Sequence, residues 1–358
     1  MTKPAYSVIV DSIIEQARSK RIKPGDSVGS ENELAEKFGV SRMTVRKALD
    51  VLATRGVVRR QAGKGTFLAR AVTGGRSPTR QTGVLICGMP YTVLQGVTEN
   101  EFFAPVYEGA QRAATEAGYS LLFAPADLAH LEKPIVARAC DGLILGMCAV
   151  PARRLKTFAE SGFPIVLMEY DLGPEMPSVK TDRFGGGVVV AEHLLSLGHK
   201  RIALITATER PDGLPTTGGF LAALERAGIE LPASLRANGD FSYESGVKAT
   251  KKLLRSRKPF TAIMCANDAM ARGALDTLAT EGIDVPKKVS VTGFEDLRSA
   301  ALATPPLTTV LVDKEELGRR AVGRLVGMIQ GSPSGSDKET IPVELVVRES
   351  TAPPPGAR

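Results

Sequence analysis

Short apolar runs alternate with amphipathic segments from residue 83 to residue 330, and this alternation strongly limits how the chain can fold. Seven runs have the composition of buried strands: 83–88, 120–124, 142–146, 165–169, 201–206, 262–265 and 289–294. Helices are predicted at 107–117, 153–161, 187–197, 217–227, 243–255, 268–281 and 315–330. Continuous apolar strands separated by helices are typical of parallel sheets covered on both faces. Because about 270 residues is long for one such sheet, the sequence predicts an α/β domain of two lobes.

The first 69 residues have a different pattern, in which short helices precede a hairpin. Apolar residues recur at helical spacing over 6–18, a short helix is predicted over 33–38, and a third helix begins after Ser41, a good N-cap. Two short strands, 57–61 and 66–68, then enclose a tight turn. The apolar stripe of the third helix consists of Val45, Ala48, Leu49 and Leu52. Its other side is donor-rich and carries Arg42, Met43, Arg46 and Lys47.

The positive charge of the chain belongs entirely to its N-terminal part. The net charge is +7, yet the first 80 residues hold 16 of the 46 Lys and Arg and 7 of the 39 Asp and Glu, a net of +9, which leaves −2 for the rest. A small basic domain on a near-neutral body indicates a polyanionic partner, although charge alone equally allows a solvated basic face. Residues 70–82 are polar, with Gly, Ser and Pro, and are expected to form a semi-flexible linker.

Several classes of protein are disfavoured by the composition. No apolar run approaches the ~18 residues of a membrane span and no apolar secretory core follows the N-terminus, so we expect a cytoplasmic protein without membrane contact. The four cysteines form no C-x-x-C pair and are expected to be buried thiols: Cys87, Cys140, Cys148 and Cys265. His193 and His199 suit packing better than metal binding. No nucleophile set or cofactor-lysine motif is present, so we expect no metal, no cofactor and no enzymatic activity.

The third helix of the N-terminal domain has the chemistry of a DNA-reading helix. Arg42 and Arg46 place donors near the N-terminal end of a helix with an apolar back, as binding in a major groove requires. The hairpin tip has little bulk, and Lys64 is attracted to a minor groove. A solvated charge is the alternative for Lys47. The expected DNA contacts are Asn32, Ser41, Arg42, Thr44, Arg46, Lys47, Gly63 and Lys64.

Residues 4–68 resemble the GntR-type winged-helix DNA-binding domain. The matching motifs are Ser30-Glu31-x-Glu33-Leu34-Ala35, Gly39-Val40-Ser41-Arg42-x-Thr44-Val45-Arg46-x-Ala48-Leu49 and Gly63-x-Gly65-Thr66-Phe67. The resemblance implies the DNA contacts named above other than Lys47, with the hairpin tip at 62–64. In two places the chain departs from the family. Val28-Gly29 replaces the usual Leu-Pro, which is expected to loosen the next helix start, and Asn32 often is Arg in the family, so its phosphate contact is expected to be weaker.

Residues 83 to about 350 resemble the LacI-type effector domain. The matching motifs include Asp141-Gly142-Leu143-Ile144, Gly198-His199-Lys200-Arg201-Ile202, Asn267-Asp268-x-x-Ala271-x-Gly273 and Pro306-Leu307-Thr308-Thr309-Val310. The resemblance implies a periplasmic-binding-protein-like fold with three crossovers, near Lys180, Thr309 and Ser334. It places lobe 1 at about 83–179 and 310–333, lobe 2 at about 180–309 and 334–350, and a tail at 351–358.

The same resemblance implies a small sugar-like effector between the lobes. The family's ligand positions correspond to Phe102 or Phe103, Glu169, Arg210, Thr216, Phe241, Asn267 and Glu295. Phe241 is the stacking candidate, with a core aromatic as an equal alternative, and the two glutamates have solvated loop acids as theirs. Thr216 stands where the family often has Arg, and a hydroxyl cannot replace five planar donors. Either Arg210 supplies the missing cation, or the ligand lacks the group that Arg would bind.

Together the two halves resemble the arabinose-repressor type of bacterial regulator. They predict an effector-controlled transcriptional repressor that binds double-stranded operator DNA. One small DNA-binding domain makes few contacts, so we expect a homodimer and a palindromic operator. The alternatives are a cytoplasmic solute-binding or transport-associated protein and a fused enzyme. The basic N-terminal domain disfavours the former, and the absence of a cofactor-lysine motif disfavours the latter.

Overall fold

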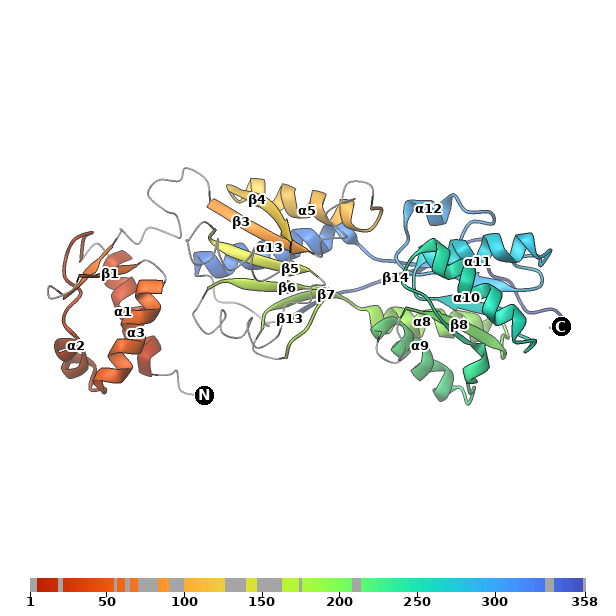
Figure 1. Cartoon of the computed structure of the whole chain (residues 1–358), viewed down its shortest axis with the longest axis horizontal. Helices are drawn as coiled ribbons and strands as arrows, with labels where there is room; N and C mark the ends of the chain where they lie inside the picture. Colours follow the sequence, from red (N-terminus) through yellow and green to blue (C-terminus); the bar gives the residue numbers. More distant parts are fainter. Residues whose placement is uncertain are drawn as a thin grey trace. The chain divides into compact units, whose positions relative to one another are not determined.

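The structure is a computed structural model, drawn in Figure 1. It describes residues 5–18, 22–54, 57–61, 65–69, 83–89, 100–125, 140–146, 163–173, 176–207, 214–331 and 338–356. Within these residues, no helix is both long enough and apolar enough to cross a membrane. The chain forms two compact units: the first contains Met1–Val97, Val106–Val179 and Glu315–Glu339, and the second contains Thr98–Pro105, Lys180–Lys314 and Thr340–Arg358.

The N-terminal domain has three helices and a two-stranded antiparallel hairpin, as predicted. Its elements are α1 (Ala5–Arg18), α2 (Glu31–Phe38), α3 (Arg42–Thr54), β1 (Val58–Gln61) and β2 (Gly65–Leu68). The apolar stripes meet in one core, in which Ile9, Val45, Leu49 and Leu52 are completely buried. The amphipathic spacing of α1 and α3 therefore explains how this small domain forms its hydrophobic core.

The start of α2 is well capped, which corrects the expectation that Val28-Gly29 loosens it. The Ser30 hydroxyl accepts a hydrogen bond from the backbone N–H of Glu33 (3.2 Å), and the Glu33 carboxylate accepts one from the N–H of Ser30 (2.7 Å). This capping box satisfies two helix-end donors without the family's usual proline. The helix consequently begins at Glu31 rather than Glu33. Gly29 has a φ of 101°, which glycine adopts without strain.

The first unit contains a six-stranded sheet in the order β13-β7-β6-β5-β3-β4. The strands are β3 (Gly83–Met89), β4 (Tyr119–Pro125), β5 (Gly142–Gly146), β6 (Ile165–Met168), β7 (Ser178–Thr181) and β13 (Lys338–Ile341). The pairs from β4 through to β7 are parallel. Helices α5 (Phe103–Glu116) and α13 (Lys314–Gln330) approach closely through glycine, since a Cβ on Gly109 would lie 2.0 Å from the carbonyl oxygen of Glu315.

The second unit contains a four-stranded parallel sheet in the order β11-β10-β8-β9. Its strands are β8 (Ile202–Thr206), β9 (Arg236–Asn238), β10 (Ala262–Cys265) and β11 (Ser290–Thr292). Its helices include α8 (Arg183–Ser196), α9 (Pro215–Arg226), α10 (Tyr243–Arg255), α11 (Asp268–Thr280) and the short α12 (Arg298–Ala301). Helix α8 packs on α9, and α10 packs on α11 (Figure 1). A two-stranded antiparallel ribbon, β12 (Thr309–Leu311) with β14 (Glu344–Val346), completes the unit.

The predicted fold class is confirmed, and most differences concern the ends of elements. The bounds of β5, β10 and α10 are those predicted. Helix α8 begins four residues earlier than predicted, at Arg183, because Asp182 caps it and its glycines are tolerated where they allow close packing on α9. Five short strands were not predicted: β7, β9, β12, β13 and β14. The predicted helix at 153–161 and the linker lie outside the described residues, whereas Cys87, Cys140 and Cys265 are buried thiols as expected.

Candidate DNA-reading surface and effector site

The donor-rich face of α3 is directed to solvent. Arg42, Arg46 and Lys47 are exposed, and so is the N-cap Ser41, whereas Thr44 is half-buried. The apolar stripe on the opposite side of the same helix is buried in the core. No conformational change is therefore needed within this domain to offer the arginines to a polyanion.

Ser41 caps α3, as its sequence position indicated. Its hydroxyl accepts a hydrogen bond from the backbone N–H of Thr44 (3.2 Å) and lies 2.9 Å from the Thr44 hydroxyl. The cap fixes the orientation of both hydroxyls at the end of α3, where the helix dipole favours an anion.

Arg46 is held by a carboxylate that the sequence analysis did not identify as functional. Its Nε and Nη2 donate to the two carboxylate oxygens of Glu31, at 3.2 and 3.1 Å, in a forked arrangement. These hydrogen bonds lower the pKa of Glu31. The Arg46 side chain nevertheless remains 52% exposed, so the contact orients the guanidinium without hiding it. Arg60 extends the group by an ion pair with Asp50 (2.9 Å).

The other predicted DNA contacts have simpler surroundings. Asn32 is exposed in the first turn of α2. The Lys47 ammonium lies 4.6 Å from the centre of the Tyr6 ring, in a cation–π contact that links α3 to α1. Gly63 and Lys64, at the hairpin tip, lie outside the described residues.

In the second unit, Phe102 and Glu295 are brought together by Arg183, another residue that the sequence analysis missed. The Arg183 Nη1 lies 3.5 Å from the Glu295 carboxylate, and its guanidinium carbon lies 5.5 Å from the centre of the Phe102 ring. The Phe294 ring is 5.6 Å from the same carbon. Phe102 and Phe103 make an edge-to-face contact with ring centres 5.0 Å apart. The Glu295 carboxylate and the aromatic rings of Phe102 and Phe294 therefore all lie around the Arg183 guanidinium in this unit.

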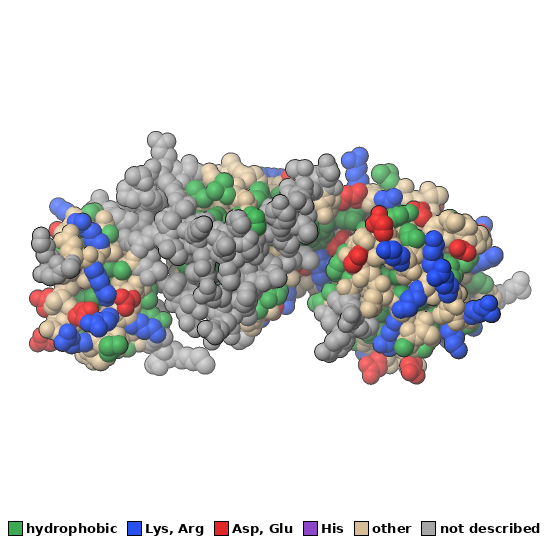
Figure 2. Space-filling view, in the orientation of Figure 1, with side chains coloured by type: hydrophobic (Ala, Val, Ile, Leu, Met, Phe, Trp, Pro, Cys, Tyr) green, Lys and Arg blue, Asp and Glu red, His purple; other side chains and the backbone are tan. Residues whose placement is uncertain are grey.

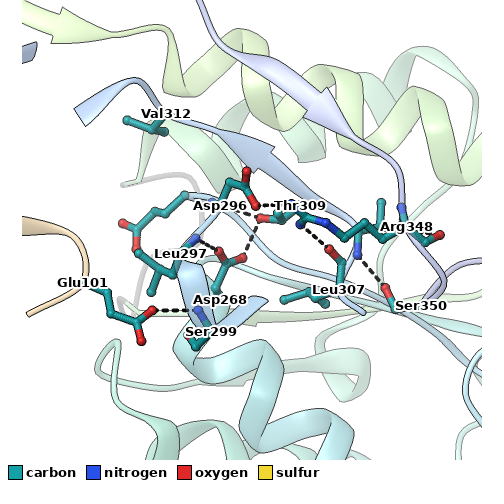
Figure 3. Close-up of polar contacts among 12 residues, drawn as sticks. Glu101, Asp268, Asp296, Leu297, Ser299, Leu307, Thr309, Val312, Arg348 and Ser350 are labelled. Carbon is teal, nitrogen blue, oxygen red and sulfur yellow. Dashed lines mark hydrogen bonds and ion pairs between the residues drawn. The ribbon is translucent and has the colours of Figure 1, made fainter. Parts of the chain in front are cut away.

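The turn that carries Glu295 has an unusual backbone, which Lys314 holds in place. Glu295 and Asp296 have φ angles of 109° and 49°, in the region that L-residues rarely adopt. The buried Lys314 ammonium donates to the carbonyl oxygens of Glu295 (2.5 Å), Val312 (3.1 Å) and Asp296 (3.3 Å). Burial lowers the pKa of Lys314, and the neighbouring acids oppose this effect. The Arg348 guanidinium fixes the Asp296 carboxylate at 2.7 Å (Figure 3).

Asp268 ties the end of the same turn to β12. One carboxylate oxygen is 2.7 Å from the backbone nitrogen of Leu297, which donates to it, and the other is 2.5 Å from the Thr309 hydroxyl (Figure 3). Asp268 is completely buried, and this burial raises its pKa to about 8. Burial disfavours the charged form of this carboxyl group, and the two hydrogen bonds that it accepts favour that form.

The remaining effector candidates that the structure describes lie in or next to several different elements. Phe241 is 40% exposed with a φ of 69°, which disfavours the core alternative, and its carbonyl accepts a hydrogen bond from the side-chain amide of the buried Asn267 (3.0 Å). Thr216 is buried in α9. Glu169 follows β6 in the first unit, with a φ of 57°. Arg210 lies outside the described residues.

Comparisons with known proteins agree with both halves of the chain. Residues 5–68 match the family described as bacterial regulatory proteins, gntR family, and residues 191–351 match the periplasmic binding protein-like domain. The HTH-type transcriptional repressor CytR of Escherichia coli K12 is 30% identical over 351 residues, covering 92% of this chain and 98% of CytR. The arabinose metabolism transcriptional repressor of Geobacillus stearothermophilus is 28% identical, with 98% of each chain covered. A solved structure of the regulator CelR with cellobiose has a TM-score of 0.68 at 28% identity, covering 86% of this chain and 90% of CelR.

A donor-rich helix exposed on a small winged domain, joined to parallel α/β units, defines a DNA-binding protein with a periplasmic-binding-protein-like effector domain. The chain belongs to the family of bacterial HTH-type transcriptional repressors, with a DNA-binding domain of the gntR type. It is a transcriptional regulator, as the sequence predicted.

Proposed function

We propose that the chain acts in the cytoplasm as a homodimeric repressor, and that a small sugar bound by its effector domain releases it from a palindromic operator. The observation that carries this proposal is the exposed donor face of α3 on an apolar core. Two-fold symmetry of a dimer would double the few contacts that one winged domain can make. The relatives named for arabinose metabolism and for cellobiose binding support a sugar as the effector class.

The proposed DNA contacts are those predicted from the sequence: Asn32, Ser41, Arg42, Thr44, Arg46, Lys47, Gly63 and Lys64. Arg42 and Arg46 carry the most weight because both are exposed near the N-terminal end of α3. A guanidinium can donate two parallel hydrogen bonds to one guanine edge or one phosphate. Glu31 assists by restricting the rotamers of Arg46 before DNA arrives.

The proposed effector contacts are Phe102, Phe103, Glu169, Arg210, Thr216, Phe241, Asn267 and Glu295, to which we add Arg183. An aromatic face suits the C–H surface of a sugar ring, and carboxylates accept hydrogen bonds from its hydroxyls. Arg183 offers the planar donors that Thr216 lacks, and its ion pair with Glu295 holds donor and acceptor side by side.

A gel-shift experiment with genomic fragments tests the proposal. The full chain should shift a small set of fragments that contain inverted repeats, and Arg42→Ala should abolish the shift while Lys200→Ala, at an exposed site in the second unit, should not. Titration with a panel of monosaccharides and disaccharides should reverse the shift for one of them. Failure to shift any fragment would favour a solute-binding protein instead.

The proposed homodimer can be tested separately from DNA binding, by the mass of the protein in solution. Light scattering on the purified full chain should give twice the mass of the 38.0 kDa chain. A monomer at the concentrations that shift DNA would contradict the two-fold arrangement and the palindromic operator with it.

A further inference from the structure

Helix α10 in the second unit has one packed face and one strongly basic face. Its packed face contains Gly246, Ala249, Thr250 and Leu253, all buried. A Cβ on Gly246 would lie 2.3 Å from the carbonyl oxygen of Met270, so α10 is in close contact with α11 on this side. The opposite side of α10 is directed to solvent.

The basic face of α10 is defined here by six exposed cations in eleven residues: Lys248, Lys251, Lys252, Arg255, Arg257 and Lys258. Figure 2 shows Lys and Arg side chains gathered over this part of the molecule. Other cations of the same unit have carboxylate partners, as Arg226 has in Glu192 (3.5 Å) and Lys287 has in Asp284 (3.1 Å). The side chains from Lys251 to Lys258 have no ion pair within the part of the chain that the structure describes.

The spacing of these cations works against the stability of the isolated helix. Lys248 is three and four residues from Lys251 and Lys252, and Arg255 is four and three residues from the same two lysines. Like charges at these spacings are neighbours on a helix surface and repel each other. The helix dipole favours cations only in the last turn, so it does not account for Lys258 beyond the end of the helix. Lys248 has acidic neighbours in Asp240 and in Glu244, four residues before it. An anionic partner would relieve all of this repulsion together.

The four cations of α10 itself, Lys248, Lys251, Lys252 and Arg255, give this face about two thirds of the linear charge density of duplex DNA. From Lys248 to Arg255 an α-helix rises by about 10.5 Å. Double-stranded DNA carries one negative charge per ~1.7 Å of its axis, or about six over that length. Since the chain is a DNA-binding regulator by family, DNA is also the polyanion that it meets at high local concentration.

We propose that the basic face of α10 is a second contact surface for duplex DNA, independent of base sequence and separate from the winged domain. It binds phosphates, and so adds affinity and salt dependence without specificity. A regulator with two such surfaces can hold a second segment of DNA besides its operator.

The test is the salt dependence of binding to a labelled mixed-sequence duplex that lacks the operator. The full chain is compared with the triple variant Lys251→Gln, Lys252→Gln, Arg255→Gln. The slope of log K against log salt should become shallower by about 0.9 for each phosphate contact removed, or about 2.7 for all three. A triple Lys/Arg exchange at the same sites (Lys251→Arg, Lys252→Arg, Arg255→Lys) keeps the charge and should keep the slope.

The matched control is Lys200→Gln, Lys287→Gln, Lys288→Gln, which changes the net charge equally at exposed sites of the same unit. It should retain the wild-type slope. An unchanged slope in the α10 variant overturns the proposal, and so does an equal reduction in the control, which would mean that only net charge matters. Circular dichroism at the assay temperature checks that every variant is folded.

Discussion

In the winged domain, the side chain of Glu31 orients the side chain of Arg46, one of the proposed DNA contacts. Glu31 holds Arg46 by two parallel hydrogen bonds, yet more than half of the arginine side chain stays exposed. A carboxylate in a DNA-reading surface repels phosphates, so its presence there has a cost for binding. Its benefit is an arginine fixed in one orientation, which loses less rotamer freedom when it binds.

Two substitutions separate these effects. Arg46→Ala should weaken operator binding by about tenfold or more, as expected for loss of a base or phosphate contact. Glu31→Gln should strengthen binding to non-operator DNA and reduce the ratio of operator to non-operator affinity, because the freed arginine can reach phosphates in several orientations. Fluorescence anisotropy on both duplexes measures the ratio. If Glu31→Gln increases that ratio, the orienting role of Glu31 is wrong.

Asp268 makes the stability of the second unit depend on pH in a predictable direction. Its folded pKa is about 8, compared with an ordinary value of 3.8. Between these values the unfolded chain releases the proton and the folded chain retains it, so stability should fall as pH rises from about 4 to about 8.

Asp268→Asn provides the comparison, because the amide oxygen can still accept the hydrogen bond from the Leu297 N–H and the side chain no longer ionises. Urea midpoints measured across this range should decline less steeply with rising pH in the variant than in the wild type. Identical pH dependence in both proteins would show that Asp268 is not the responsible group.

Among the helices, contact through glycine is the main packing device. A Cβ on Gly187 of α8 would lie 1.9 Å from the carbonyl oxygen of Thr216 in α9, and one on Gly219 would lie 2.0 Å from that of Phe184. The contacting atoms are backbone carbonyl oxygens, which cannot move aside as the end of a flexible side chain can. These glycines lower the helix propensity of α8 and α9, and the close packing that they permit compensates for it.

Gly187→Ala should therefore destabilise the protein by about 1–3 kcal/mol, the usual range for overpacking. Gly323→Ala in α13 is the matched control, because nothing lies within 4 Å of its Cβ position. The control should be neutral or stabilise by up to about 1 kcal/mol, since alanine favours a helix. Urea unfolding of both variants gives the comparison, and equal effects at the two sites would refute the close-contact explanation.

The same elements show what could be predicted from the sequence. Strands β5 and β10, which are buried along their whole length, were predicted with their bounds, because continuous burial requires a continuous run of apolar or glycine residues. Strands β9 and β12 have three residues each and no such run. The capping box at Ser30 was present in the sequence, and its motif could have corrected both the start of α2 and the expectation of a loose end.

Site residues were predictable only where a motif carried them. Arg42 and Arg46 occupy motif positions, whereas the partner of Arg46 is 15 residues away and depends on how α2 and α3 cross. The contact between Phe102 and Arg183 joins residues 81 apart, and Lys314 acts on the carbonyl oxygens of a turn 18 and 19 residues earlier. No periodicity reports such contacts, because they arise from the tertiary fold.

For the molecule as a whole, the proposed function requires that the effector and DNA influence each other through the chain. Lys314 is the last residue of its unit before the chain continues at Glu315 into the other, and it holds the turn that carries Glu295. Lys314→Met should leave three carbonyl oxygens without their donor and destabilise the second unit by about 1–3 kcal/mol. Urea unfolding measures this loss, and a variant as stable as the wild type would show that the ammonium does not hold the turn.

The central claim is that sugar binding and operator binding are coupled, and reciprocity is its most direct measurement. For the sugar that the full chain binds most tightly, the factor by which saturating sugar weakens operator binding must equal the factor by which saturating operator weakens sugar binding. Titration calorimetry on one preparation of the full chain gives both. We predict two equal factors of about 5 to 150. A sugar that binds with operator affinity unchanged would contradict the account.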